Sequence, residues 1–130
     1  IYELNRWKNE EVTRTTLFNK LIREFNSLEI KKNLPSSYFD ESRYIIPLRF
    51  ILHYPNIKKK YKILSNFIDI SWFWFFSPIH GKNEELKNYK YILGSCPILE
   101  KNGKNIINLP CNIKIKEHEK LFFVIKKIFK

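Results

Sequence analysis

The side chains of this 130-residue chain that could act as nucleophiles, general bases or metal ligands are few and widely spaced. The histidines are His53, His80 and His118, and the cysteines are Cys96 and Cys111. Zinc sites need such groups at short, defined spacings, and thiol catalysis needs a base beside the nucleophile. Neither arrangement occurs, so the sequence predicts no metal site, no catalytic residue and two free thiols. Cys96 precedes a predicted helix, which favours a thiolate, but without an adjacent histidine we interpret it as structural.

Length and composition indicate one folded domain. A chain of 130 residues with 44% apolar residues can form a core, and the 16% of aromatic residues must mostly lie inside it. The chain contains no methionine, not even at position 1, so we expect it to be the C-terminal part of a longer protein. The most apolar stretch, residues 68–79, is too short to span a bilayer and carries Asp69. With no signal peptide either, a cytoplasmic protein is expected.

The net charge of +11 favours an anionic partner such as nucleic acid. However, the chain has 19 lysines against five arginines and no alanine, which is typical of an A/T-rich genome. Arginine, the better reader of phosphates and bases, is scarce, and the lysines are spread over nearly every segment. A small basic nucleic-acid-binding domain therefore stays the weaker alternative.

Helical and strand patterns alternate along the chain. Residues 10–28 carry apolar side chains three and four positions apart, which predicts a helix that Asn9 can cap. Residues 43–52 predict a strand in which Pro47 marks an edge or a bulge. The remaining elements expected are a helix at 57–67, a second strand or extended run at 68–76, a short piece at 84–91, a helix from 96 that Gly103 weakens or ends, a strand at 106–109 and a helix at 116–129.

These elements predict an α+β fold with a small sheet of about three strands and helices packed mainly on one face. The connections are short, and residues 1–130 form a single domain without repeats. The aromatic run 72–75 is interpreted as core, because a nucleic-acid stacking platform would interleave basic residues.

Charged residues have ordinary structural interpretations. Residues 58–60 are three lysines expected on a solvated helix face, with phosphate binding as the alternative. Arg43 is expected to pair with Asp40 or Glu41, and Arg49 lies on the same strand face as Arg43.

Three segments in order carry a resemblance to a known family. They are R-Y-I-I-P-L-R-F at 43–50, W-F-F-S-P-I-H at 74–80, and G-S-C-P-I-L-E at 94–100 followed by I-I-N-L-P at 106–110. Together they resemble the C-terminal domain of the DegT/DnrJ/EryC1/StrS aminotransferase family, from residue 10 to the end of the chain. Leu99 and Gly103 depart from the family pattern, which commonly has alanine and a helix former there.

The resemblance implies the small domain of an aspartate-aminotransferase-like fold. Enzymes of this family are homodimers that use pyridoxal phosphate to move an amino group, typically from glutamate, to a nucleotide-linked keto-sugar. Their large N-terminal domain, absent here, carries the Schiff-base lysine and most cofactor contacts. No lysine of this chain stands beside a phosphate-binding loop and an acidic partner for the cofactor, so the chain alone is expected to be inactive.

His80 is the residue that the resemblance assigns to substrate binding. It follows Pro78 in a turn similar to the P-x-H turn that faces the active-site mouth in the family. The alternative is a surface or hydrogen-bonded histidine without a role in binding. A non-catalytic remnant that keeps the fold also remains open.

Overall fold

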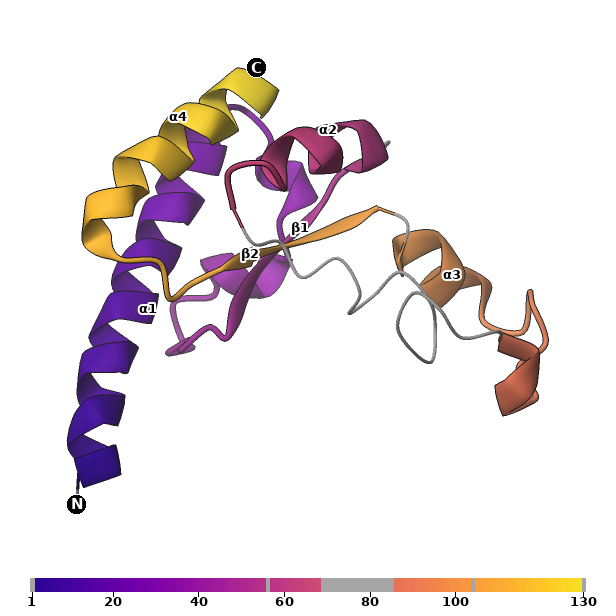
Figure 1. Ribbon diagram of the computed structural model, residues 1–130, viewed down its shortest axis with the longest axis horizontal. Helices are drawn as coiled ribbons and strands as arrows, with labels where there is room; N and C mark the ends of the chain where they lie inside the picture. The colour runs from indigo at the N-terminus through magenta and orange to yellow at the C-terminus, as the bar shows by residue number, and fades with distance from the viewer. Residues whose placement is uncertain (1, 56, 69–85, 104, 130) are drawn as a thin grey trace.

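The computed structural model describes residues 2–55, 57–68, 86–103 and 105–129, and its elements confirm the α+β class (Figure 1). The main elements are α1 (Tyr2–Ser27), β1 (Arg49–His53), α2 (Ile57–Leu64), α3 (Pro97–Gly103), β2 (Ile106–Pro110) and α4 (His118–Phe129). Four single turns of 3₁₀-helix join them: η1 (Lys31–Asn33), η2 (Ser36–Phe39), η3 (Leu86–Tyr89) and η4 (Ile115–Glu117).

The sheet of the described residues is an antiparallel ribbon of β1 and β2. Arg49 lies opposite Pro110, and His53 lies opposite Ile106. Alternate residues of a strand face opposite sides, so four buried side chains share one face of the ribbon: Phe50, Leu52, Ile107 and Leu109. About three strands were expected, and the described residues form two of them. The third was expected at 68–76, and apart from Ile68 this run lies outside the described residues.

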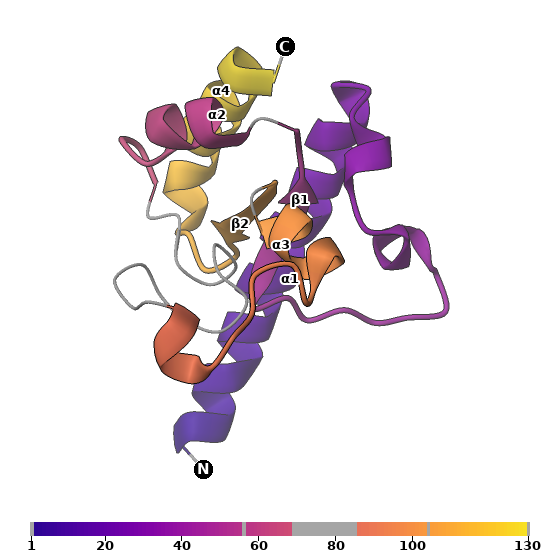
Figure 2. The same cartoon turned by 90° about the vertical axis from the view of Figure 1, so that its right-hand side faces the viewer.

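The helices α1, α2 and α4 bury their apolar sides in one core with this ribbon face. α1 contributes four residues from its second half, and α4 contributes five at helical spacing. α4 lies along α1 and beside α2, whereas α3 stands apart, beyond the end of the ribbon where β2 begins (Figures 1 and 2). The expected packing of helices mainly on one face is therefore confirmed for these three. The core residues of α1 and α4 are Leu17, Phe18, Leu21, Phe25, Leu121, Val124, Ile125, Ile128 and Phe129.

The expected start of the first helix at residue 10, with Asn9 as its cap, is wrong, because α1 already runs from Tyr2. Residues 2–9 hold neither glycine nor proline, so nothing interrupts the helix there. Asn9 lies inside it, and its carbonyl oxygen accepts a hydrogen bond from the Thr13 hydroxyl at 2.9 Å. The first half of α1 extends away from the rest of the molecule (Figure 1).

The expected strand at 43–52 is also shorter than predicted, because β1 begins at Arg49. Pro47 has no N–H to give to a ladder, and Arg43 instead pairs with Asp40, with 2.7 Å between Nε and Oδ2. That pair confirms the expected partner of Arg43. Apart from the run at 68–76, the other elements begin and end within three residues of their predicted bounds, and α3 ends at Gly103, one of the two outcomes expected there.

The C-terminus of α1 closes in a Schellman motif with an unusual residue at its centre. The N–H of Ile30 donates to the Phe25 carbonyl at 3.3 Å, and the N–H of Glu29 donates to the Asn26 carbonyl at 3.2 Å. Glu29 has φ +58°, the left-handed conformation that glycine adopts without a steric penalty.

We expect Glu29→Gly to stabilise the protein by about 0.5–1 kcal/mol, because glycine removes the steric cost at φ +58°. Urea unfolding followed by circular dichroism measures the change. Glu29→Ala removes the same carboxylate but keeps a Cβ, so it should not stabilise. A stabilisation by alanine equal to that by glycine would mean that charge, not backbone conformation, limits stability here.

Lys60 corrects the expectation of a solvated lysine face on the second helix. Its ammonium group donates a hydrogen bond to the carbonyl of Ile128 at the end of α4. It also lies 5.0 Å from the ring centre of Tyr54 and 5.2 Å from that of Phe129. A cation there complements the negative end of the α4 dipole and the faces of two aromatic rings. Lys62 of the same helix is exposed.

Replacing Lys60 with alanine should therefore destabilise the protein by about 1–2 kcal/mol, the sum of a cation–π contact, a helix-end charge and a hydrogen bond. Lys62→Ala, the matched control on α2, should stay within about 0.5 kcal/mol of the parent protein. Urea denaturation at low and high salt measures the free energy of unfolding of both variants. Equal effects of the two variants would show that Lys60 acts only through the net charge.

Candidate functional site

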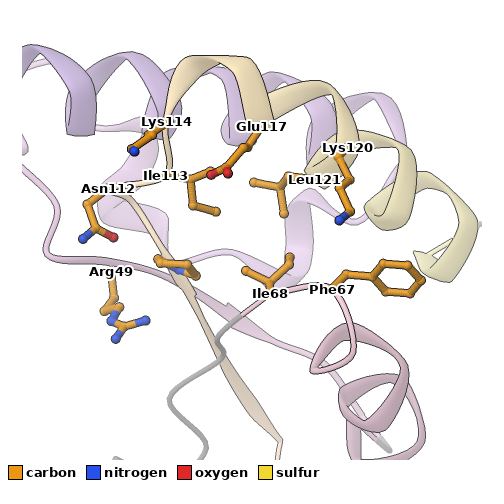
Figure 3. A pocket seen from close by; sticks show the side chains of 10 residues that line it. Arg49, Phe67, Ile68, Asn112, Ile113, Lys114, Glu117, Lys120 and Leu121 are labelled. Carbon is orange, nitrogen blue, oxygen red and sulfur yellow. The ribbon is translucent and has the colours of Figure 1, made fainter.

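A cavity of about 420 Å³ lies where the end of the ribbon meets the beginning of α4; we call it the α4 pocket (Figure 3). Three parts of the chain form it. The paired residues Arg49 and Pro110 supply the ribbon side, residues 112–114 and the start of α4 supply the opposite side, and the chain after α2 closes it. Its lining residues are Arg49, Phe67, Ile68, Pro110, Asn112, Ile113, Lys114, Glu117, Lys120 and Leu121.

The polar lining of the α4 pocket is mainly cationic. Arg49 is half-buried, Lys114 and Lys120 are exposed, and Glu117 is the single carboxylate among the lining residues. The formal charge of these four side chains is therefore +2. Between them lies an apolar surface that includes the buried residue Leu121. The arrangement suits a ligand that carries negative charge and an apolar part.

His118 holds the wall of this pocket in place. Its side chain is 2% exposed, and its Nε2 atom lies 3.0 Å from the carbonyl oxygen of Ile113. A carbonyl oxygen can only accept, so Nε2 is the donor of this hydrogen bond. The Nδ1 atom is buried without a hydrogen-bond partner, and the ring packs edge-on against Phe122. No local sequence pattern indicates this positioning role, because the partner is a backbone carbonyl.

A second cavity of about 460 Å³ lies between α1 and the connection at residues 31–45. Three of its polar side chains, Asp40, Arg43 and Tyr44, already have internal partners. Asp40 accepts hydrogen bonds from Ser42 and, with a smaller effect, from Arg43, and these bonds lower the pKa of its carboxyl. The Tyr44 hydroxyl donates to Glu11 at 2.7 Å, which raises the pKa of the phenol. These internal pairs leave this cavity less suited than the α4 pocket to bind a charged ligand.

The G-S-C-P-I-L-E segment closes on itself through Glu100. The carboxylate oxygen Oε1 of Glu100 accepts the Tyr91 hydroxyl at 2.6 Å and the Gly94 N–H at 2.7 Å. The hydrogen bond to Glu100 raises the pKa of Tyr91. Gly94 has φ +93°, so only glycine fits this turn without strain. In the structure the segment therefore forms a turn that leads into α3.

The two cysteines are free thiols, as the sequence predicts, in opposite surroundings. Cys96 is exposed. Cys111 is fully buried at the end of β2, and burial raises the pKa of its thiol to about 12, although Arg14 and Arg49 oppose the shift. Cys111 is thus a small apolar core residue at neutral pH.

His80 and the aromatic run 72–75 lie outside the residues that the structure describes, so their predicted roles remain predictions. Within residues 2–55, 57–68, 86–103 and 105–129, no three histidine, cysteine or acidic side chains meet in a group that could hold a metal ion. The helices of the same ranges include none with the length and apolar character needed to cross a membrane. Comparisons with protein-family models, curated proteins and solved structures give no match.

We expect iodoacetamide to label one cysteine of the native protein, Cys96, because alkylation requires an accessible thiolate. At pH 8 a thiol with a pKa of about 12 is ionised in roughly one molecule in ten thousand, and Cys111 is also inaccessible. Mass spectrometry of the intact protein should show one adduct from pH 7 to 10 and two adducts in urea. Native labelling of Cys111 at pH 8 would contradict its burial.

Proposed function

We propose that this chain is the C-terminal small domain of a pyridoxal-phosphate-dependent aminotransferase of the DegT/DnrJ/EryC1/StrS family, acting on a nucleotide-linked keto-sugar. The observation that carries the proposal is the meeting of two motif segments that lie far apart in the sequence. The end of R-Y-I-I-P-L-R-F and the strand I-I-N-L-P pair antiparallel, with Phe50 opposite Leu109. Segments that resemble the family in sequence thus form one structural unit, which chance similarity does not require.

The surface of the domain gives separate support. The first half of α1 exposes large apolar side chains, with Leu4 69% and Trp7 52% exposed. A second exposed apolar group surrounds α3 and contains Ile92, Leu93, Ile98 and Leu99. Apolar surface of this extent is expected on a domain that packs against a larger one. In the proposal the large domain of the same protein covers it.

The described lysines do not form a site for the cofactor. A Schiff-base lysine needs a phosphate-binding loop and an acidic group for the pyridine nitrogen. Lys60 is bound to the end of α4, Lys126 pairs with Glu24 at 3.4 Å, and the other lysines whose side chains are described are exposed. No step through pyridoxal phosphate is therefore assigned to this chain; the proposed large domain supplies it.

The decisive experiment reads the DNA upstream of the Ile1 codon and expresses the continuous reading frame. The proposal expects a large domain with a lysine that forms a borohydride-reducible absorbance band with pyridoxal phosphate. The purified protein should transfer the amino group of glutamate to a nucleotide-linked keto-sugar. A stop codon or frameshift directly upstream would favour the non-catalytic remnant, and an unrelated upstream domain would overturn the proposal.

In that protein, His80→Ala tests the predicted substrate contact. Loss of a hydrogen bond to a sugar or phosphate oxygen should lower kcat/KM for the sugar about ten-fold, mainly through KM, and change stability by less than about 0.5 kcal/mol. His53→Ala is the control, because His53 lies in the ribbon opposite Ile106 and should affect folding before kinetics. Unchanged kinetics with lost stability in His80→Ala would show that His80 is structural.

A further inference from the structure

We propose that the α4 pocket binds a phosphorylated small molecule with a planar or apolar part, of the size of a nucleoside monophosphate. The proposal rests on the described pocket alone and does not depend on the aminotransferase proposal. It concerns residues other than His80, which lies outside the described residues.

The cationic side chains are the first argument. Arg49 and Lys114 lie at one end of the α4 pocket with the Asn112 side chain, and Lys120 lies toward the other end (Figure 3). The Lys114 ammonium group and the Asn112 amide offer N–H donors to one phosphate, and the Arg49 guanidinium group, which already has a partner, adds positive charge beside them. The pocket also opens at the start of α4, where the helix dipole is positive. We therefore place the phosphate at the Lys114 end.

The size and the apolar surface of the pocket are the second argument. A volume of about 420 Å³ lies in the range of small-molecule sites and exceeds what inorganic phosphate alone would fill. Ile68 and Leu121 lie between the two cationic ends, and Phe67 offers a half-exposed ring beside them (Figure 3). A planar ring system can pack on this surface. This part of the pocket would be without function for a bare anion.

Glu117 determines the remaining chemistry. Its carboxylate lines the same cavity as the three cations and would repel a phosphate. It can accept hydrogen bonds from sugar hydroxyls, which a phosphorylated sugar or nucleotide carries. A ligand with several negative charges and no hydroxyl is disfavoured. Replacing Glu117 should therefore strengthen the binding of inorganic phosphate, whereas replacing one of the lysines should weaken it.

The test is isothermal titration calorimetry, which measures the affinity of the purified 130-residue chain for AMP, adenosine and inorganic phosphate at low salt. AMP should bind measurably more tightly than either fragment, and its affinity should fall as salt screens the charges. Lys114→Gln should weaken AMP binding about five-fold and Lys120→Gln about two-fold, because each variant loses one exposed ion pair and Lys114 lies at the phosphate end. Glu117→Gln should tighten binding of inorganic phosphate about three-fold.

Lys116→Gln is the matched control, because Lys116 is exposed in the neighbouring turn η4 and does not line the pocket. It changes the net charge by the same amount and should leave AMP affinity within two-fold of the parent chain. Equal losses in Lys114→Gln and Lys116→Gln would reduce the effect to non-specific attraction and overturn the proposal. The absence of AMP binding, or equal affinity for AMP and phosphate, would overturn it as well. Urea unfolding of each variant confirms that it is folded.

Discussion

The pairing of β1 with β2 is the constraint on which the rest of this fold depends. Phe50 lies on the buried face of the ribbon. Its ring stacks on that of Phe25 in α1, with 5.4 Å between ring centres, and meets the ring of Phe18 edge-on, with 5.7 Å between ring centres. The buried side chains of α2 and α4 join the same core. A slip of one residue in the register would turn Phe50 to the opposite face and remove the surface on which three helices pack.

On the edge of β1 that faces away from β2, a side chain pairs with a backbone N–H. The N–H of Ile51 donates a hydrogen bond to the Tyr38 hydroxyl at 2.8 Å, and the Tyr38 ring packs 5.1 Å from that of Phe50. Burial raises the pKa of Tyr38, so the phenol stays neutral and keeps its hydrogen bond far above neutral pH. Through Tyr38, the turn η2 therefore pairs a backbone N–H of β1 and adds an aromatic ring to the core. Because this N–H is occupied, β1 is less able to pair with a strand of another chain.

The sequence predicted the elements whose pattern is local and missed what depends on distant neighbours. The apolar period of α4 and the short strand ended by Pro110 were predicted to within two residues. Asparagine is a common helix cap, but its presence in the sequence does not show whether a helix has already begun before it. The start of α1 at Tyr2 was therefore missed. The role of Lys60 depends on the end of α4, and the α4 pocket combines three separate segments. No periodicity in any one segment indicates either feature.

The excess of positive charge links stability to the α4 pocket. A net charge of +11 makes the compact state repel itself. Arg14 pairs with Glu10 at 3.4 Å and Lys126 with Glu24, whereas Lys114 and Lys120 lie exposed around one cavity. An anion bound there offsets repulsion between the beginning of α4 and the end of the ribbon. Because it binds only the folded chain, it also shifts the folding equilibrium by mass action. The position of the pocket at the ribbon end thus couples ligand binding to the strand pairing that organises the core.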